Sequence, residues 1–172
     1  MRKPRIYGDL DNDKQVVIVS TSAAADALQA VLPSLAVLSW TGDKDKIDWT
    51  PLIRRRVVCW ADKALPSMSD MAGVAAYIRV YGNPSMKLIK QPDDKPKGWG
   101  PLMMLQAGAS ATDIIAFCKA NAVDLSFPSD LFAKISTEYR AKHATRPPPA
   151  IADYDPEPSI EDIEAELAAR EG

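Results

Sequence analysis

Two short polar segments follow apolar runs, and their residue types suit phosphate or metal chemistry. Ser20-Thr21-Ser22 comes directly after the run at residues 15–19, and Asp62-Lys63 comes just after the run at residues 56–60. Hydroxyls beside helix N-terminal amides can hold a phosphate group. A carboxylate is a hard oxygen ligand of the kind that Mg²⁺ prefers. The two segments therefore indicate a candidate phosphate-binding point and a candidate metal ligand.

Each segment also has a structural interpretation, which stays open. The group Ser20-Thr21-Ser22 can simply cap a helix, and Asp62 can pair with Lys63 or with a nearby backbone amide at a strand end. One carboxylate beside a lysine makes a poor Mg²⁺ site, because the ion usually takes one or two carboxylates plus substrate phosphates and the lysine opposes it by like charge. We therefore expect no bound cofactor, with Asp62 as the candidate ligand if Mg²⁺ binds at all.

Basic and aromatic residues supply candidate contacts to DNA or RNA. Lysine and arginine neutralise phosphates, and tryptophan stacks on bases. The alternatives are a solvated basic edge and tryptophans that pack in the core or at its rim. The candidate nucleic-acid-binding residues are Ser20, Ser22, Lys44, Lys46, Arg54, Arg55, Lys63, Lys97 and Trp99.

The elements that position these residues follow from hydrophobic patterning. Apolar runs predict strands, and longer alanine-rich or amphipathic stretches predict helices. Such an alternation is typical of βαβ units, whose sites form beyond the carboxyl ends of the strands. We predict an α/β fold with a mostly parallel central sheet flanked by helices. The predicted strands are 15–19, 36–40, 56–60 and 86–90; the predicted helices are 23–32, 69–81 and 112–121, the last with Thr112 as its cap, and one more helix is possible at 131–142.

A series of short motifs runs from Tyr7 to about Ala120. In order, they are Tyr7-Gly8, Val16-Val17-Ile18-Val19 with Ala24-Ala25-Asp26-Ala27-Leu28, Ser39-Trp40-Thr41-Gly42, Asp48-Trp49-Thr50-Pro51-Leu52, Arg55-Arg56-Val57-Val58-Cys59-Trp60-Ala61-Asp62 and Lys95-Pro96-Lys97-Gly98-Trp99. In the order and spacing of these motifs the chain resembles the toprim domain of phage and plasmid DNA primases of the primase–helicase type. The resemblance implies a toprim-like, Rossmann-like fold and metal-dependent nucleotidyl or phosphoryl transfer.

The acidic motifs that the resemblance implies are largely replaced in this chain. In the family, a glutamate follows the first strand, an Asp-x-Asp pair follows the third, and an acidic residue commonly follows Gly-Trp. The corresponding residues here are Ser20-Thr21-Ser22, Asp62-Lys63-Ala64 and Gly100. A cluster of carboxylates has become one aspartate, so the resemblance predicts a degenerate site.

A proline run divides the chain into residues 1–146, the α/β domain, and residues 147–172, an acidic tail. The tail carries eight acidic residues against Arg170, a net charge of −7, whereas residues 1–146 carry 20 basic and 15 acidic residues, a net charge of +5. Ser159 and Asp162 form a capping-box pattern in the tail. Apolar residues at 160, 163 and 167 leave two possibilities, a solvated tail or a short docking helix.

Composition indicates a cytoplasmic protein without a membrane partner. No apolar run approaches the roughly 20 residues that cross a bilayer, and no signal-peptide pattern follows the basic residues 1–5. Cys59 and Cys118 lie in apolar segments far apart, which predicts free buried thiols in a reducing compartment.

Three functions fit these observations. The favoured one is a degenerate toprim-like module that binds nucleic acid, or a replication or host protein. For this module we expect no metal-dependent catalysis. The second is an active Mg²⁺-dependent primase- or nuclease-type enzyme with ligands displaced to Asp43, Asp45 or Asp70. The third is an interaction or inhibitor protein that uses the acidic tail.

Overall fold

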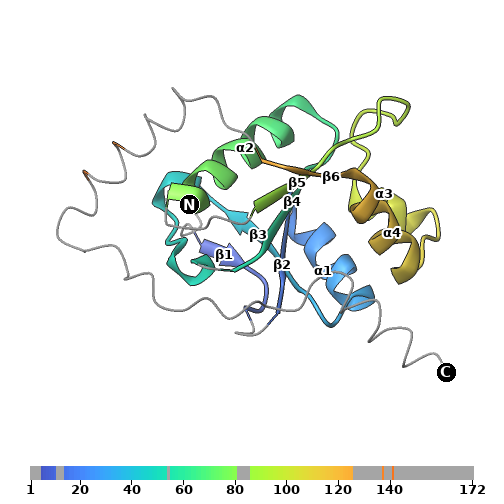
Figure 1. Ribbon diagram of the computed structural model, residues 1–172, viewed down its shortest axis with the longest axis horizontal. Coiled ribbons are helices and arrows are strands. Elements are labelled where there is room, and N and C mark those ends of the chain that lie inside the picture. Colours follow the sequence, from blue (N-terminus) through green and yellow to red (C-terminus); the bar gives the residue numbers. More distant parts are fainter. Residues whose placement is uncertain are drawn as a thin grey trace.

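Four apolar runs form the centre of a mixed six-stranded sheet flanked by helices (Figure 1). The computed structural model describes residues 5–10, 14–53, 55–80, 86–125, 137 and 141. Neighbouring central strands pair in parallel, β2 with both β3 and β4, and β4 with β5. The prediction of a parallel centre built from these runs is confirmed. The central strands are β2 (Val16–Val19), β3 (Ala36–Thr41), β4 (Val57–Trp60) and β5 (Met86–Ile89).

Two short strands that the sequence analysis did not predict complete the sheet, in the order β1-β3-β2-β4-β5-β6. β1 (Arg5–Tyr7) pairs antiparallel with β3, and β6 (Ala122–Asp124) pairs antiparallel with β5. Three residues on a partly exposed edge give no hydrophobic period to detect. The hydroxyl of Tyr7 ties β1 to the helix that follows β2, because it lies 2.9 Å from both carboxylate oxygens of Asp26.

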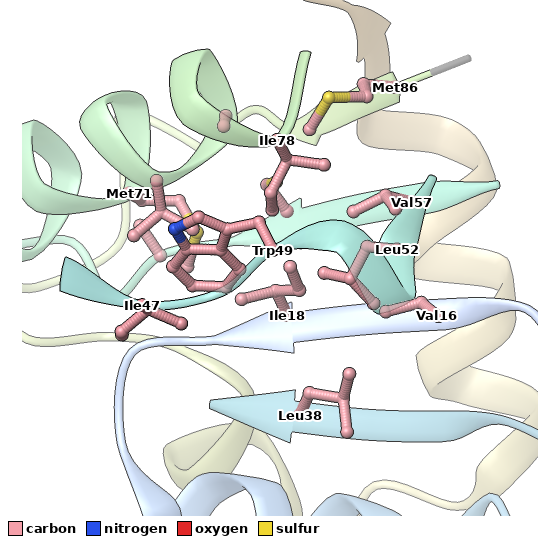
Figure 2. Packing of buried hydrophobic residues seen from close by; sticks show 14 of the residues in the cluster. Val16, Ile18, Leu38, Ile47, Trp49, Leu52, Val57, Met71, Ile78 and Met86 are labelled. Atoms are coloured by element: carbon pink, nitrogen blue, oxygen red, sulfur yellow. The ribbon is translucent and has the colours of Figure 1, made fainter. Parts of the chain in front are cut away.

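One face of the sheet is covered by α2 (Leu65–Val80) together with two 3₁₀ turns, η1 (Lys44–Lys46) and η2 (Thr50–Leu52). Trp49 lies between α2 and the sheet, against Ile18, and its indole N–H donates to the Lys44 carbonyl at 2.9 Å (Figure 2). α2 begins four residues before the predicted start, since Pro66 is tolerated in a first turn. The predicted last residue, Tyr81, lies outside the described residues.

The other face carries α1 (Ser22–Val31), α3 (Pro101–Gln106) and α4 (Ala111–Asn121) (Figure 1). α1 packs mainly against β3 and β2, and α1 and α4 bury small and branched residues in one cluster with β2, β3, β4 and β5. α3 was not predicted, because six residues opened by a proline resemble a loop in the sequence. The helical residues buried on this face are Ala24, Ala25, Leu28, Pro101, Ile114 and Ile115.

The cap of α4 differs from the predicted one. Ser110, not Thr112, is the N-cap: its hydroxyl accepts from the Asp113 N–H at 3.2 Å, and the Asp113 carboxylate accepts from the Ser110 N–H at 2.8 Å. This reciprocal capping box satisfies two amides that would otherwise lack partners. Thr112 is an exposed residue of the first turn.

Several predictions concern parts of the chain outside the described residues. Among residues 131–142, Thr137 and Ala141 are described, and both are helical. The boundary at residues 147–149 and the tail beyond it are not described. Within the described ranges, no helix is long and apolar enough to cross a membrane.

Candidate functional site

The polar segments after β2 and β4 meet at the carboxyl edge of the sheet. Val19 and Trp60 are partners in the parallel ladder, so the chain leaves both strands at the same level. The Asp62 backbone N–H donates to the Ser20 Oγ at 3.0 Å, across 42 residues of sequence. The hydroxyl and the aspartate that the sequence analysis singled out therefore lie in one place, as expected for this edge of a parallel sheet.

Gly100 lies directly against Asp62. A Cβ atom on residue 100 would stand 3.2 Å from the Asp62 Cα and 3.1 Å from its Cγ, and would overlap Oδ1. The carboxylate thus occupies the space that a side chain at position 100 would need. Glycine fits at position 100 because this segment and the segment at Asp62 approach each other closely. The spacing of residues in the sequence did not predict this contact.

The carboxylate of Asp62 lies in a desolvated position. It is half-buried, and burial raises the pKa of this group above its ordinary value. Among the described residues, no hydrogen-bond donor or cation reaches its oxygens. Removing a carboxylate from water without such a partner disfavours the charged form. A carboxyl group of this kind can take up a proton, but by itself it is a weak ligand for a divalent ion.

Lys63 points its ammonium into the loop between β5 and α3. Its Nζ donates to the carbonyl oxygens of Pro92, Asp93 and Lys95 at 2.7, 2.8 and 2.6 Å. Its backbone pairs with the end of the same loop, since its N–H donates to the Trp99 carbonyl at 2.6 Å. Of the two structural alternatives for Asp62, pairing with Lys63 or with a nearby backbone amide, neither is found among the described residues: the Lys63 ammonium binds three backbone carbonyls, and no donor reaches the Asp62 carboxylate.

The same loop carries two further side chains toward the sheet. Gln91 is buried, and its amide nitrogen donates to the Ala61 carbonyl, which joins the ends of β5 and β4. Trp99 is 9% exposed and packs edge-on against Phe117, with ring centroids 5.0 Å apart. Sequence reasoning missed Gln91, for which no motif signal exists. The packing of Trp99 was among its alternatives.

The lysines after β3 are held by neighbouring carboxylates. Lys44 contacts Asp70 at 2.8 Å, and Lys46 contacts Asp43 at 2.6 Å. The hydrogen bond from Lys46 lowers the pKa of Asp43 and, in return, raises the pKa of Lys46. Two of the three displaced ligands considered for an active enzyme, Asp43 and Asp70, are therefore already engaged by lysines.

The remaining candidates divide between the two edges of the sheet. Ser22, the first residue of α1, and Lys97, in the loop after β5, are exposed at the carboxyl edge. Arg55 is 6% exposed at the opposite edge, where its guanidinium donates to the Lys14 carbonyl at 2.7 Å. Arg54 lies outside the described residues. Arg55 thus joins the starts of β2 and β4 and takes no part in the cluster around Asp62.

Neither metal chemistry nor thiol chemistry has an assembled site in the described part of the chain. No three side chains of the types His, Cys, Asp or Glu come together there as a possible metal site. The two cysteines are free, as predicted, and burial raises the pKa of each thiol to about 12. Cys59 is fully buried, whereas Cys118 is partly exposed on α4.

Comparison of the chain with models of known protein families finds no match, and neither does comparison with curated protein sequences. Function must therefore be argued from the geometry at the carboxyl edge.

Proposed function

We propose that this chain is a degenerate toprim-like module that binds nucleic acid through the carboxyl edge of its sheet, without metal-dependent catalysis. One observation carries the proposal. Ser20, Asp62 and Gly100, the positions where the resemblance implies acidic motifs, meet at one point although about 40 residues separate each from the next. Parallel pairing of β2 with β4 already brings Ser20 and Asp62 to one edge, whereas the contact of Gly100 with Asp62 is not required by strand pairing and is the part of the convergence that supports the resemblance.

The loss of catalysis follows from what occupies those positions. Phosphoryl transfer needs divalent ions held by several hard oxygen ligands. Here a serine hydroxyl accepts a backbone hydrogen bond, a glycine makes room for the aspartate, and one desolvated carboxylate remains. An enzyme with displaced ligands would first have to break the pairs that Lys46 and Lys44 form with Asp43 and Asp70.

Binding of nucleic acid is favoured by the groups exposed at this edge. Lys46 and Lys97 are exposed there, and Ser22 begins a ten-residue helix. Residues 1–146 carry a net charge of +5, which favours contact with phosphates. Sequence-independent backbone contact requires no more than such a basic edge. A replication or host protein with an acidic surface is the alternative partner.

Fluorescence anisotropy with labelled single- and double-stranded oligonucleotides tests the proposal. Lys97→Ala and Lys46→Ala should each weaken binding and reduce the slope of log affinity against log salt by roughly one. Lys87→Ala is the matched control, because Lys87 is an exposed lysine near the amino end of β5, away from the carboxyl edge. Equal effects at all three lysines, or no binding at low salt, would reject the carboxyl edge as a nucleic-acid surface.

A further inference from the structure

Three backbone carbonyls between β5 and α3 converge on one cation, the ammonium group of Lys63. The Nζ–O distances to Pro92, Asp93 and Lys95 are 2.7, 2.8 and 2.6 Å. An ammonium group has three N–H donors, so each donor has one carbonyl. These distances are those of charge-assisted hydrogen bonds.

The loop that supplies the carbonyls is exposed at its tip. Asp93, Asp94, Pro96 and Lys97 are exposed. Within the loop, the Lys95 N–H donates to the Pro92 carbonyl at 3.3 Å and the Trp99 N–H donates to the Pro96 carbonyl at 3.1 Å. The bonds of the Lys63 ammonium are the charge-assisted ones between this tip and the end of β4.

The far end of the loop is joined to the same lysine. The Gly98 N–H donates to the Lys63 carbonyl, and the Lys63 N–H donates to the Trp99 carbonyl, both at 2.6 Å. Gly100 follows at once and lies against Asp62. The backbone of Lys63 thus holds the segment from Gly98 to Gly100 beside the candidate site, and its ammonium holds the preceding part of the same loop.

We propose that the carbonyls of Pro92, Asp93 and Lys95 form a binding site for a monovalent, ammonium-type cation, occupied in the native protein by Lys63. Lys63 acts as a positioning residue that holds the loop across the strand ends. When its side chain is shortened, the site accepts a free primary alkylammonium ion. This inference does not depend on the proposed nucleic-acid function.

The ligands explain why the site suits an ammonium group and not a divalent ion. All three are neutral carbonyl oxygens, and no carboxylate in the described part of the chain bonds to the Lys63 ammonium. Their distances from Nζ exceed the roughly 2.0–2.1 Å that Mg²⁺ requires and the roughly 2.3–2.6 Å of Ca²⁺. Three carbonyls match in number the three N–H donors of R–NH₃⁺.

Chemical rescue of Lys63→Ala in the full chain tests the site. This substitution removes Cγ, Cδ, Cε and Nζ, and n-propylammonium has the same four heavy atoms. Hydrogen–deuterium exchange of residues 92–99 measures whether the loop is held. Tetramethylammonium is the salt control, since it carries charge but no N–H donor, and Lys97→Ala is the control for loss of an exposed lysine from the same loop.

In Lys63→Ala we expect exchange of residues 92–99 to rise about tenfold or more, which the loss of one charge-assisted hydrogen bond suffices to produce. Added n-propylammonium should restore protection saturably, tetramethylammonium should not, and Lys97→Ala should exchange like the native chain. Absence of saturable rescue, equal rescue by both ions, or equal loosening in Lys97→Ala would overturn the proposal.

Two further measurements keep the test decisive if Lys63→Ala does not fold. Lys63→Met keeps most of the aliphatic stem, so its loop should loosen without rescue by n-propylammonium. In the native chain, competitive acetylation followed by mass spectrometry should label Lys63 at least about tenfold more slowly than the exposed Lys90 and Lys97. Labelling of all three lysines at one rate would exclude an occupied carbonyl site.

Discussion

The carboxylate of Asp62 occupies the space in which a side chain on residue 100 would stand. A Cβ there would lie 3.2 Å from the Asp62 Cα and would overlap Oδ1. The two positions are therefore coupled: the present placement of the aspartate requires a glycine opposite it. A second acidic residue at position 100 would force one of the two segments to move.

This coupling predicts that Gly100→Ala destabilises the protein by about 1–3 kcal/mol, as overpacking generally does. The free energy of unfolding in urea measures the effect. Gly73→Ala is the control, because its Cβ would meet the flexible end of Lys44 and alanine favours a helix interior. Combining Gly100→Ala with Asp62→Ala should recover part of the loss; strictly additive losses would contradict the coupling.

Burial raises the pKa of Asp62, which sets the sign of a pH effect. Between the ordinary pKa of 3.8 and the raised folded value, the folded state binds more protons than the unfolded state. The free energy of unfolding should therefore fall as pH rises through that window, relative to Asp62→Asn. Urea midpoints of the two proteins from about pH 3 to 7 measure the difference.

Asp113→Asn provides the opposite control for this titration. Hydrogen bonds from Ser110 lower the pKa of Asp113, so its contribution to stability is present above its ordinary pKa and is lost as pH falls through the folded value. If the differences for Asp62 and Asp113 run in the same direction with pH, the desolvation of Asp62 is refuted.

The capping box of α4 predicts different costs for two neighbouring hydroxyl residues. Ser110→Ala removes the N-cap acceptor and should cost about 1 kcal/mol of unfolding free energy. Thr112→Ala changes an exposed first-turn residue and should stay within about 0.5 kcal/mol of the native value. Thermal or urea unfolding of both variants measures the two losses of unfolding free energy. A larger loss for Thr112→Ala would show that Thr112, as expected from sequence, is the N-cap.

The replacement of acidic residues predicts negligible Mg²⁺-dependent primer synthesis or strand cleavage by this chain. Primer extension and nuclease assays with Mg²⁺ or Mn²⁺ measure both activities. Crystals soaked in Mn²⁺ test the ligand directly, through anomalous density beside Asp62. Metal-dependent turnover that disappears in Asp62→Ala would show that one carboxylate suffices.

The acidic tail is predicted to weaken whatever nucleic-acid binding the rest of the chain has. Residues 147–172 carry −7 and residues 1–146 carry +5, and a tethered tail competes intramolecularly for the basic groups. Removing residues 147–172 should tighten DNA binding at low salt, where the Debye length is roughly 30 Å at 0.01 M. The gain should shrink as salt rises. Equal affinities of the two chains at low salt would exclude this competition.

β2 and β4 could be predicted from sequence because their apolar runs are buried on both faces, whereas β5 carries the exposed Lys87 between Met86 and Leu88. The four residues of β2 and the four of β4 are all buried, so burial itself enforces the apolar composition. Longer alanine-rich or amphipathic stretches likewise predicted α1 and most of α2 and α4. β1, β6 and α3 escaped prediction, because three to six residues at an edge or behind a proline obtain their structure from neighbouring chain.

Part of the candidate site could also be predicted from sequence. Ser20 and Asp62 each follow an apolar run, and parallel strands bring their carboxyl ends to one edge. The partners of Lys63 could not be predicted. A lysine beside an aspartate in sequence suggests an ion pair, whereas in the fold its ammonium binds three carbonyls about 30 residues away.

Local patterning thus determined which segments become strands and helices, since burial imposes a period that the sequence must carry. Three features depended on tertiary structure alone. Arg55 lies at the opposite edge of the sheet from Asp62, where it contacts Lys14. The Asp62 carboxylate fills the space beside Gly100, and the Lys63 ammonium binds the loop after β5. These contacts join segments dozens of residues apart. Their geometry depends on how the chain crosses between strands, which no local pattern records.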